Sequence, residues 1–195
     1  MGERMYKTFA NLILHNQVSF EKGKMSLLGQ PIAILPIEEY YYMQRILEKK
    51  GLENIIYYSA KESGILWLDN MIPKFKMKLN DVVKWGIEIL SISGWGNLKL
   101  KLIDKTNNKM IFNLSEATIA KKYGTHSSSV DHLLRGYVAA AGTKFLGIDV
   151  DAIEHKCVAK GDSYCQYIIK PKKDFDQSSP IVKIQLKKDF DTAIY

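Results

Sequence analysis

The spacing of apolar and polar residues changes along the chain, and these changes predict where strands and helices lie. Residues 11–35 alternate as in extended structure and are interrupted by turns at Gly23 and Gly29. From Ile37 the apolar positions recur every three or four residues up to Gly51, and glycine commonly ends a helix. The N-terminal part of the chain is therefore predicted to contain short strands followed by a helix.

The later segments show the same two periods. Leucines alternate with lysines from Leu98 to Leu102, the chain turns at residues 107–108, and it then returns, which is typical of a hairpin. Asn80 is a suitable N-cap for the helix that precedes this hairpin. The remaining predicted helices cover residues 53–68 and 115–145, and the last predicted strands cover residues 148–158 and 164–169.

Composition limits the class of protein more than its function. The chain has 195 residues, of which 46% are hydrophobic; this is enough for one sizeable core, and no apolar run reaches membrane-spanning length. The net charge of +7 permits contact with nucleic acid or another acidic surface. Because many lysines alternate with apolar residues, as in residues 99–102, a solvated strand face explains them better than a track for phosphates.

Both cysteines lie in one short stretch that carries the main chemical signal of the sequence. Glu154, Cys157 and Cys165 flank the turn signal Gly161-Asp162, with apolar and β-branched residues on both sides. Two antiparallel strands joined by a tight connection would bring two sulfurs and one carboxylate around a single ion. Thiolates and carboxylates bind zinc, which in structural sites needs a fourth ligand from elsewhere in the chain.

The same spacing also fits two other interpretations. Cys157 and Cys165 can be small buried apolar residues, or they can form a disulfide. On a regular strand Glu154 and Cys157 point to opposite faces, so they converge only if a bulge or the turn intervenes. No signal peptide is expected, which favours a reducing, cytoplasmic location and thiols that are free or bound to metal.

A second segment, residues 116–135, has the spacing of a helix-turn-helix. In this interpretation Ser128, Ser129 and His132 face the bases of DNA. In the alternative, the second helix is part of the core and begins at a capping box that ends at Asp131. Its apolar residues continue towards residue 145, which is long for a recognition helix.

The sequence lacks the common catalytic signatures. It contains no dinucleotide-binding glycine motif after a strand, no complete P-loop and no nucleophile elbow. The four histidines form no catalytic pattern. Nothing in the sequence therefore demands a nucleophile or a redox cofactor.

Several of these residues together resemble one known family. The chain contains Gly29-x-x-Ile32-Ala-Ile-Leu-Pro36, Gly136-Tyr137, Gly147 and Glu154-x-x-Cys157-x-x-x-Gly161-Asp162-x-x-Cys165. This order is similar to the V4R (4-vinyl reductase) domain family, and the chain resembles a free-standing, archaeal hydrocarbon-binding member. The resemblance implies an α/β (α+β) fold in which several helices pack on an antiparallel sheet. It places a ligand-sensing domain at residues 1–170, followed by a C-terminal tail or an added edge strand at residues 171–195.

The resemblance also implies a zinc ion beside the ligand pocket. Sensor members of the family hold this ion with one glutamate and three cysteines, and three of those positions match Glu154, Cys157 and Cys165. The fourth position is Asp131 instead of cysteine. Asp131 can bind zinc through oxygen, and the adjacent His132 can do so through nitrogen. The implied role is structural, because the ion would tie the start of a helix to the strand turn.

A small apolar or aromatic molecule is the ligand that the resemblance implies, and a homodimer is the expected assembly. Aromatic side chains dominate such pockets, and each candidate can equally be part of the core. The candidates for the pocket wall are Trp67, Trp85, Tyr137 and Phe145. Vinyl-group reduction, after the family's name, is a second alternative beside DNA binding, although no motif for an electron carrier is present. The expected function is therefore small-molecule binding or sensing, without insertion into a membrane.

Overall fold

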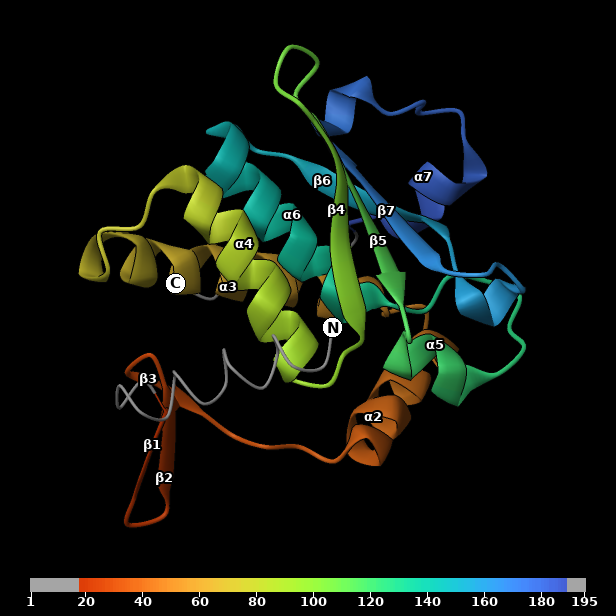
Figure 1. Cartoon of the computed structure of the whole chain (residues 1–195). Coiled ribbons are helices and arrows are strands. Elements are labelled where there is room, and N and C mark those ends of the chain that lie inside the picture. Colours follow the sequence, from red (N-terminus) through yellow and green to blue (C-terminus); the bar gives the residue numbers. More distant parts are fainter. Residues whose placement is uncertain (1–17, 189–195) are drawn as a thin grey trace. The chain divides into compact units, whose positions relative to one another are not determined.

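The computed structural model describes residues 18–188, and the chain divides into two compact units after Tyr40 (Figure 1). The first unit contains a three-stranded antiparallel sheet of β1 (Val18–Glu21), β2 (Lys24–Leu27) and β3 (Gln30–Ile32). Gly23 and Gly29 make the two turns at φ values of +80° and +74°, which glycine adopts without strain. The predicted extended structure is confirmed from residue 18, and residues 11–17 lie outside the described range.

The second unit contains a four-stranded antiparallel sheet in the order β4-β5-β7-β6 (Figure 1). Its strands are β4 (Asn97–Asp104), β5 (Lys109–Ser115), β6 (Asp151–Lys156) and β7 (Cys165–Lys170). Buried residues alternate along β5 and β7, so one face of the sheet carries Phe112 and Tyr167 into the core. The predicted hairpin and the two last predicted strands are confirmed.

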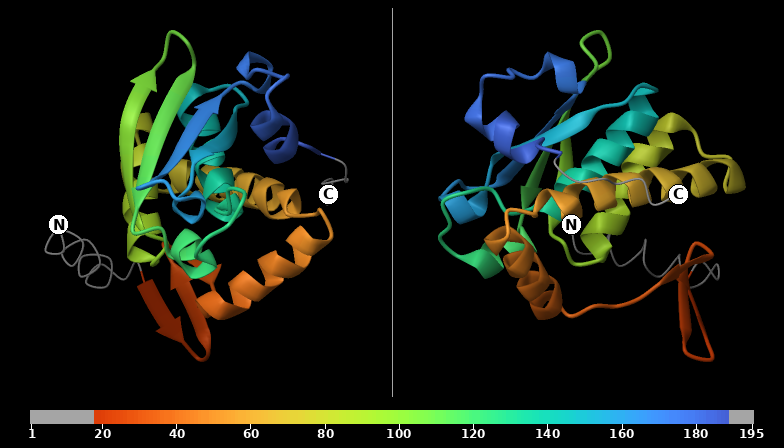
Figure 2. Two further views of the ribbon diagram at one scale, coloured as in Figure 1. Left: turned by 90° about the vertical axis from the view of Figure 1, so that its right-hand side faces the viewer. Right: turned by 180° about the vertical axis from the view of Figure 1, so that it is seen from behind.

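Six α-helices lie within residues 18–188. They are α2 (Ile37–Lys49), α3 (Asn54–Lys74), α4 (Leu79–Ile92), α5 (Thr118–Tyr123), α6 (His132–Leu146) and α7 (Pro180–Gln185). α6 contacts β6 and β7, and α3 and α4 pack against α6 (Figure 2). No helix in this part of the chain is both long enough and apolar enough to cross a membrane.

Two helices have boundaries that differ from those predicted. The helix predicted at residues 53–68 continues to Lys74. The helix predicted to start after Asn80 begins at Leu79, with Lys78 as its N-cap. The amide of Lys78 donates to the Asp81 carboxylate at 3.2 Å, which fixes the earlier start.

Glycines let α6 approach its neighbours closely. A Cβ on Gly136 would lie 2.4 Å from the carbonyl oxygen of Tyr57 in α3. A Cβ on Gly142 would lie 2.7 Å from the side chain of Ile169 in β7. α6 is therefore the central element of the second unit, in contact with a helix on one side and with the sheet on the other.

Two predictions about the second half of the chain need correction. Residues 115–145 form two helices, α5 and α6, with residues 124–131 between them. Residues 171–188 contain the 3-10 helix η2 (Lys172–Asp174) and α7, and this range holds no strand. The edge-strand alternative is therefore wrong up to residue 188, because Pro180 starts a helix that buries Val182 and Gln185. Residues 189–195 lie outside the described range, and the predicted boundary at residue 170 stays a prediction.

Candidate metal centre

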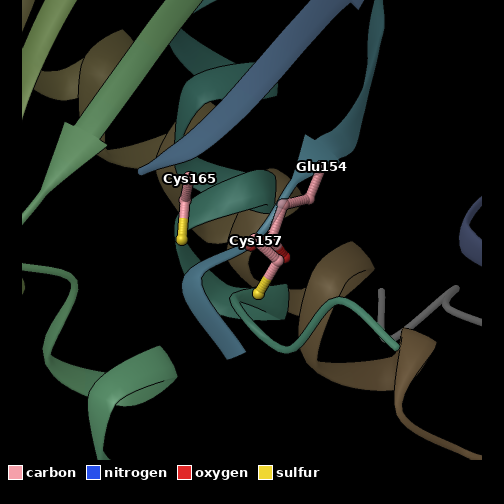
Figure 3. Close-up of side chains that lie close together, drawn as sticks. All are labelled: Glu154, Cys157 and Cys165. Atoms are coloured by element: carbon pink, nitrogen blue, oxygen red, sulfur yellow. The ribbon is translucent and has the colours of Figure 1, made fainter. Parts of the chain in front are cut away.

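β6, β7 and the connection between them bring the three predicted ligand residues together (Figure 3). Glu154 lies in β6, Cys157 directly follows this strand, and Cys165 is the first residue of β7. Their ligand atoms all lie within 4.8 Å of one another, and all three residues are buried. The convergence predicted from the sequence is therefore confirmed.

An irregularity in β6 makes this convergence possible. Glu154 pairs with Tyr167 of β7, whereas Lys156, two residues later, pairs with the adjacent Gln166. One residue of β6 is thus left without a partner, as in a β-bulge. Without the bulge, the side chains of Glu154 and Cys157 would point to opposite faces of the strand.

A tight connection then returns the chain to the second cysteine. The 3-10 helix η1 (Val158–Lys160) is followed by Gly161 at a φ of +95°. The Cys157 amide donates to the Asp162 carboxylate at 2.9 Å, and the Val158 amide donates to Cys165 Sγ at 3.3 Å. Both thiols are free, so the disulfide alternative is not found.

Asp131 adds a second carboxylate to this place. It occupies the N-cap position of α6, but its side chain makes no capping hydrogen bond. Instead, Asp131 Oδ2 accepts from the Tyr167 hydroxyl at 2.9 Å, and the Asp131 amide donates to Glu154 Oε2 at 2.9 Å. The other two oxygens, Asp131 Oδ1 and Glu154 Oε1, are buried and have no hydrogen-bond partner. Asp131, Glu154, Cys157 and Cys165 are called the metal corner below.

Acidic groups crowd together in the metal corner. Burial, and next the neighbouring Asp131, raise the pKa of Glu154 well above its usual range. Burial, and next Cys157, raise the pKa of Asp131 to about 7. A hydrogen bond with Cys165 lowers the pKa of Cys157 to about 6, while the pKa of Cys165 is raised. Within residues 18–188, no lysine or arginine forms an ion pair with either carboxylate.

The alternative fourth ligand, His132, has a different environment. Its Nε2 lies 3.6 Å from Glu48 Oε1, and both residues line a cleft outside the metal corner. Burial lowers the pKa of His132 although the Glu48 carboxylate opposes this effect. Neither Asp131 nor His132 belongs to the group of converging ligand atoms, and of the two it is Asp131 that bonds to Glu154.

A second group of charged residues surrounds Asp151, a buried carboxylate on the same strand. Lys61 Nζ is 3.0 Å from Asp151 Oδ1 and 2.8 Å from Asp149 Oδ1. The Tyr57 hydroxyl donates to Asp151 at 2.7 Å and accepts from the Ala152 amide at 3.0 Å. Burial alone would lower the pKa of Lys61, but the two carboxylates outweigh it and raise this pKa. Lys61, Tyr57, Asp149 and Asp151 are called the lysine cluster below.

The cleft beside the metal corner has a volume of about 510 Å³. Most of its lining residues are polar or charged, including Arg45, Glu48, Ser129, His132 and Gln185, but apolar atoms form the larger part of its surface. None of the four aromatic residues predicted for a ligand pocket lines this cleft. The cleft thus lacks the aromatic wall that was predicted for the ligand pocket.

The four predicted aromatic residues lie on three helices that pack together. Phe145 of α6 is buried, and the other three are partly exposed. Tyr137 of α6 lies 3.3 Å from the position that a Cβ on Gly64 of α3 would take. Trp67 follows Gly64 by almost one turn of α3, so Tyr137 and Trp67 border the same contact. Trp85 lies on α4, which also packs against α6.

The predicted helix-turn-helix is wrong. Residues 124–131 separate its two helices, whereas that motif has a turn of about three or four residues. Ser129 and His132 are buried, and the Ser129 hydroxyl donates to the Glu154 carbonyl at 3.0 Å. Ser128 is exposed but does not cap α6, whose N-cap is Asp131. Two of the three residues expected to face DNA are therefore unavailable to it.

Sequence reasoning missed two residues next to the metal corner. Arg135 is only 1% exposed, lies over the Tyr57 ring at 4.1 Å and donates to Asn54 at 2.8 Å. One arginine in an otherwise apolar stretch of α6 is a signal that could have indicated this buried role. Gln185 of α7 contacts the backbone of Glu154, and no local signal predicts that contact.

Comparisons with known proteins agree with this architecture. No protein-family model matches the chain. An uncharacterized protein of Methanocaldococcus jannaschii is 28% identical over 120 residues, which are 62% of this chain and 65% of that protein. The match thus spans slightly less than two thirds of the relative.

Two solved structures share the fold. The phenol-responsive sensory domain of the transcription activator PoxR, in complex with phenol, is 14% identical, with a TM-score of 0.72 over 94% of this chain and 98% of that domain. A vinyl-4-reductase family protein from Methanocaldococcus jannaschii is 18% identical, with a TM-score of 0.50 over 71% of this chain and 83% of that protein. The V4R-like α+β fold implied by the sequence is therefore confirmed.

Proposed function

We propose that this V4R-like chain binds a small apolar or aromatic molecule and holds a structural zinc ion in the metal corner. The observation that carries the proposal is a pair of unpartnered, buried carboxylate oxygens beside two buried thiols. Unpaired polar atoms in a protein interior cost free energy, and a divalent cation would remove that cost. The PoxR sensory domain, which shares the fold, is bound to phenol in its solved structure, and this supports the small-molecule part.

The donors in the metal corner match zinc in type. Cys157 and Cys165 would supply sulfur and Glu154 would supply oxygen, since their ligand atoms lie within 4.8 Å of one another. Asp131 is not part of this converging group, and its unpartnered oxygen would supply the fourth donor. The ion would balance negative charge and cross-link the start of α6 to the β6–β7 connection. The remaining negative charge would lie near the N-terminal end of α6, whose partial positive charge favours anions. An aspartate in place of the family's third cysteine is thus compatible with a zinc site.

The zinc proposal is tested by elemental analysis of the purified protein. We expect about one zinc per chain, as for a closed structural site. Cys165→Ser should lose the zinc, whereas Asp149→Asn, which changes an exposed carboxylate of the lysine cluster, should retain it. A metal-free wild-type protein in which both thiols react and stability is unchanged would contradict the proposal.

We place the small-molecule site at the contact of α3, α4 and α6, next to Trp67, Trp85 and Tyr137. These side chains are neither fully buried nor fully exposed, and all three lie on helices that meet at α6. Trp85 lies three residues after the buried Val82, so it lies on the packed side of α4. Partly covered aromatic faces suit an apolar aromatic ligand better than the charged cleft does.

Tryptophan emission gives a direct test of this site, because it would hold two of the three tryptophans of the chain. Phenol and toluene should change the emission and raise the melting temperature of the wild-type protein. Trp67→Ala should abolish both responses. Trp95→Phe, in the turn before β4, should keep them. A flat response to both probes at saturating concentration would count against the site.

Neither alternative function gains support from the described residues. DNA binding through residues 116–135 lacks the helix-turn-helix that was its basis. No observation favours vinyl-group reduction, so it is not proposed. The homodimer stays a prediction that size measurement in solution can check.

A further inference from the structure

Gln185, the last residue of α7, contacts the backbone of the metal ligand Glu154. Its Oε1 accepts from the Glu154 amide at 2.7 Å, and its Nε2 donates to the Glu154 carbonyl at 3.1 Å. The same Oε1 accepts from Arg135 Nη1 at 3.2 Å. The Gln185 side-chain amide therefore pairs with Glu154 as a neighbouring strand would.

β6 needs such a partner at this position because it is an edge strand of its sheet. In an antiparallel ladder, the amide and the carbonyl of one residue point to the same side. Glu154 directs both groups away from β7 and towards Gln185, and the Ser129 hydroxyl also donates to its carbonyl. The backbone of Glu154 is thus fixed from outside the sheet.

Side chains from α3 and α6 hold the end of α7 in place. They donate to three successive backbone carbonyls, which belong to the group that a helix end leaves unpaired. The pairs are Asn54 with Ile184 at 2.7 Å, Arg135 with Gln185, and Tyr58 with Leu186 at 3.1 Å. These bonds give α7 one defined docked position, with Gln185 directed at β6.

We propose that Gln185 is a positioning residue for Glu154, and that docking of α7 and binding of zinc stabilise each other. The inference rests on the proposed zinc site and goes beyond it, because it assigns the C-terminal helix a part in metal affinity. Mutation of a residue that orients a metal ligand commonly lowers metal affinity by about 10- to 100-fold. Coupling between two binding events is reciprocal, so zinc must also favour the docked helix.

Zinc affinity in competition with a chelator is the first test. Gln185→Ala should weaken zinc binding about 10-fold, as is typical for residues that support a metal ligand. Gln177→Ala is the matched control, since Gln177 bonds the Lys172 carbonyl within the same segment and does not contact β6. Its zinc affinity should equal that of the wild type.

Two further variants separate positioning from general stability. Gln185→Glu keeps the acceptor for the Glu154 amide but loses the donor to its carbonyl, so it should lose less affinity than Gln185→Ala. Gln185→Glu also replaces Gln185→Ala as the test variant if Gln185→Ala does not fold. Val83→Ala removes buried volume in α4 and should lower the melting temperature while zinc affinity stays at the wild-type value.

The reciprocal test is amide hydrogen exchange in α7. Removing zinc should speed exchange at Lys183 and Leu186, whose amides bond to the carbonyls of Ser179 and Val182 in the docked segment. Two results would overturn the inference while leaving the zinc site intact. One is wild-type zinc affinity in both Gln185 variants, and the other is hydrogen exchange in α7 that does not change when zinc is removed. A wild-type protein without zinc overturns both proposals together.

Discussion

Asp151 and Glu154, three residues apart on β6, are both buried carboxylates, but their surroundings differ. Asp151 has the Lys61 ammonium at 3.0 Å and the Tyr57 hydroxyl at 2.7 Å. Glu154 lies beside a second carboxylate and two thiols, and one of its oxygens has no partner. The lysine cluster therefore contains its own cation, whereas no residue of the metal corner is positively charged and the nearby Arg135 bonds to Gln185 and Asn54 instead.

The difference shows that burial of charged groups does not by itself indicate a ligand-binding site. In the lysine cluster the neighbouring carboxylates raise the pKa of Lys61, so its charged form is stabilised. In the metal corner the pKa values of Asp131 and Glu154 are raised, so their charged forms are disfavoured. An unbalanced cluster points to a missing cation, and a balanced cluster points to a role in folding.

Removal of zinc should give the largest effect, and it should leave the lysine cluster unchanged. At a zinc concentration about 1,000 times its Kd, binding stabilises the folded state by about 4 kcal/mol, which a chelator would remove. Thermal unfolding with and without EDTA measures this loss. Cys157→Ser should be destabilised without EDTA and should not respond to it, and a melting temperature equal to the wild type would contradict the site.

Lys61→Met should break the lysine cluster and leave the metal corner intact. We expect a loss of about 3 kcal/mol in the free energy of unfolding, because Asp151 then remains buried without its cation. Denaturant unfolding gives this value, and elemental analysis should still give wild-type zinc content. Loss of zinc in this variant would show that the two clusters are not independent.

Asp131 sharpens the comparison, because it is the position where the chain departs from the family's three cysteines. Asp131→Ala should weaken zinc binding about 10-fold through loss of one ligand or its support. Asp131→Cys should retain zinc, since sulfur is a good donor for this ion. Equal affinity in Asp131→Ala and the wild type would exclude Asp131 as a ligand.

Ser129→Ala should have the smallest effect. It removes one hydrogen bond to the Glu154 carbonyl, and Gln185 still donates to the same oxygen. We expect a loss of about 1 kcal/mol in the free energy of unfolding. Chemical unfolding with zinc present provides the measurement, and a loss comparable to that of Lys61→Met would mean that Ser129 has a larger role.

The local part of the metal corner could be predicted because its three central residues lie in one hairpin with a clear turn signal. Asp131 was predicted as a ligand only from the family resemblance, because it lies at the start of α6 and not in this hairpin. The lysine cluster could not be predicted, because Lys61 and Asp151 are separated by 90 residues. A contact between residues so far apart leaves no local pattern in the sequence.

Helices and strands were predictable where their period was long and regular. The short tail was not, because over a few residues an alternating pattern and a helical pattern overlap. Val182 and Gln185 are buried at helical spacing, although the alternation around them is typical of a strand. Within residues 115–145 the helix-turn-helix spacing indicated a break, but it predicted a short turn, whereas all of residues 124–131 leave the helix.

The close seating of α6 also determines which helix can yield to an incoming molecule. Gly136 and Gly142 already bring α6 into contact with α3 and with the sheet. A shift of α6 towards either neighbour would therefore cause steric overlap. α4 has only Val82 and Val83 buried and is followed by Gly94 at a φ of +85°. A molecule bound among these helices, as proposed above, would therefore have fewer buried side chains to displace on α4 than on α6.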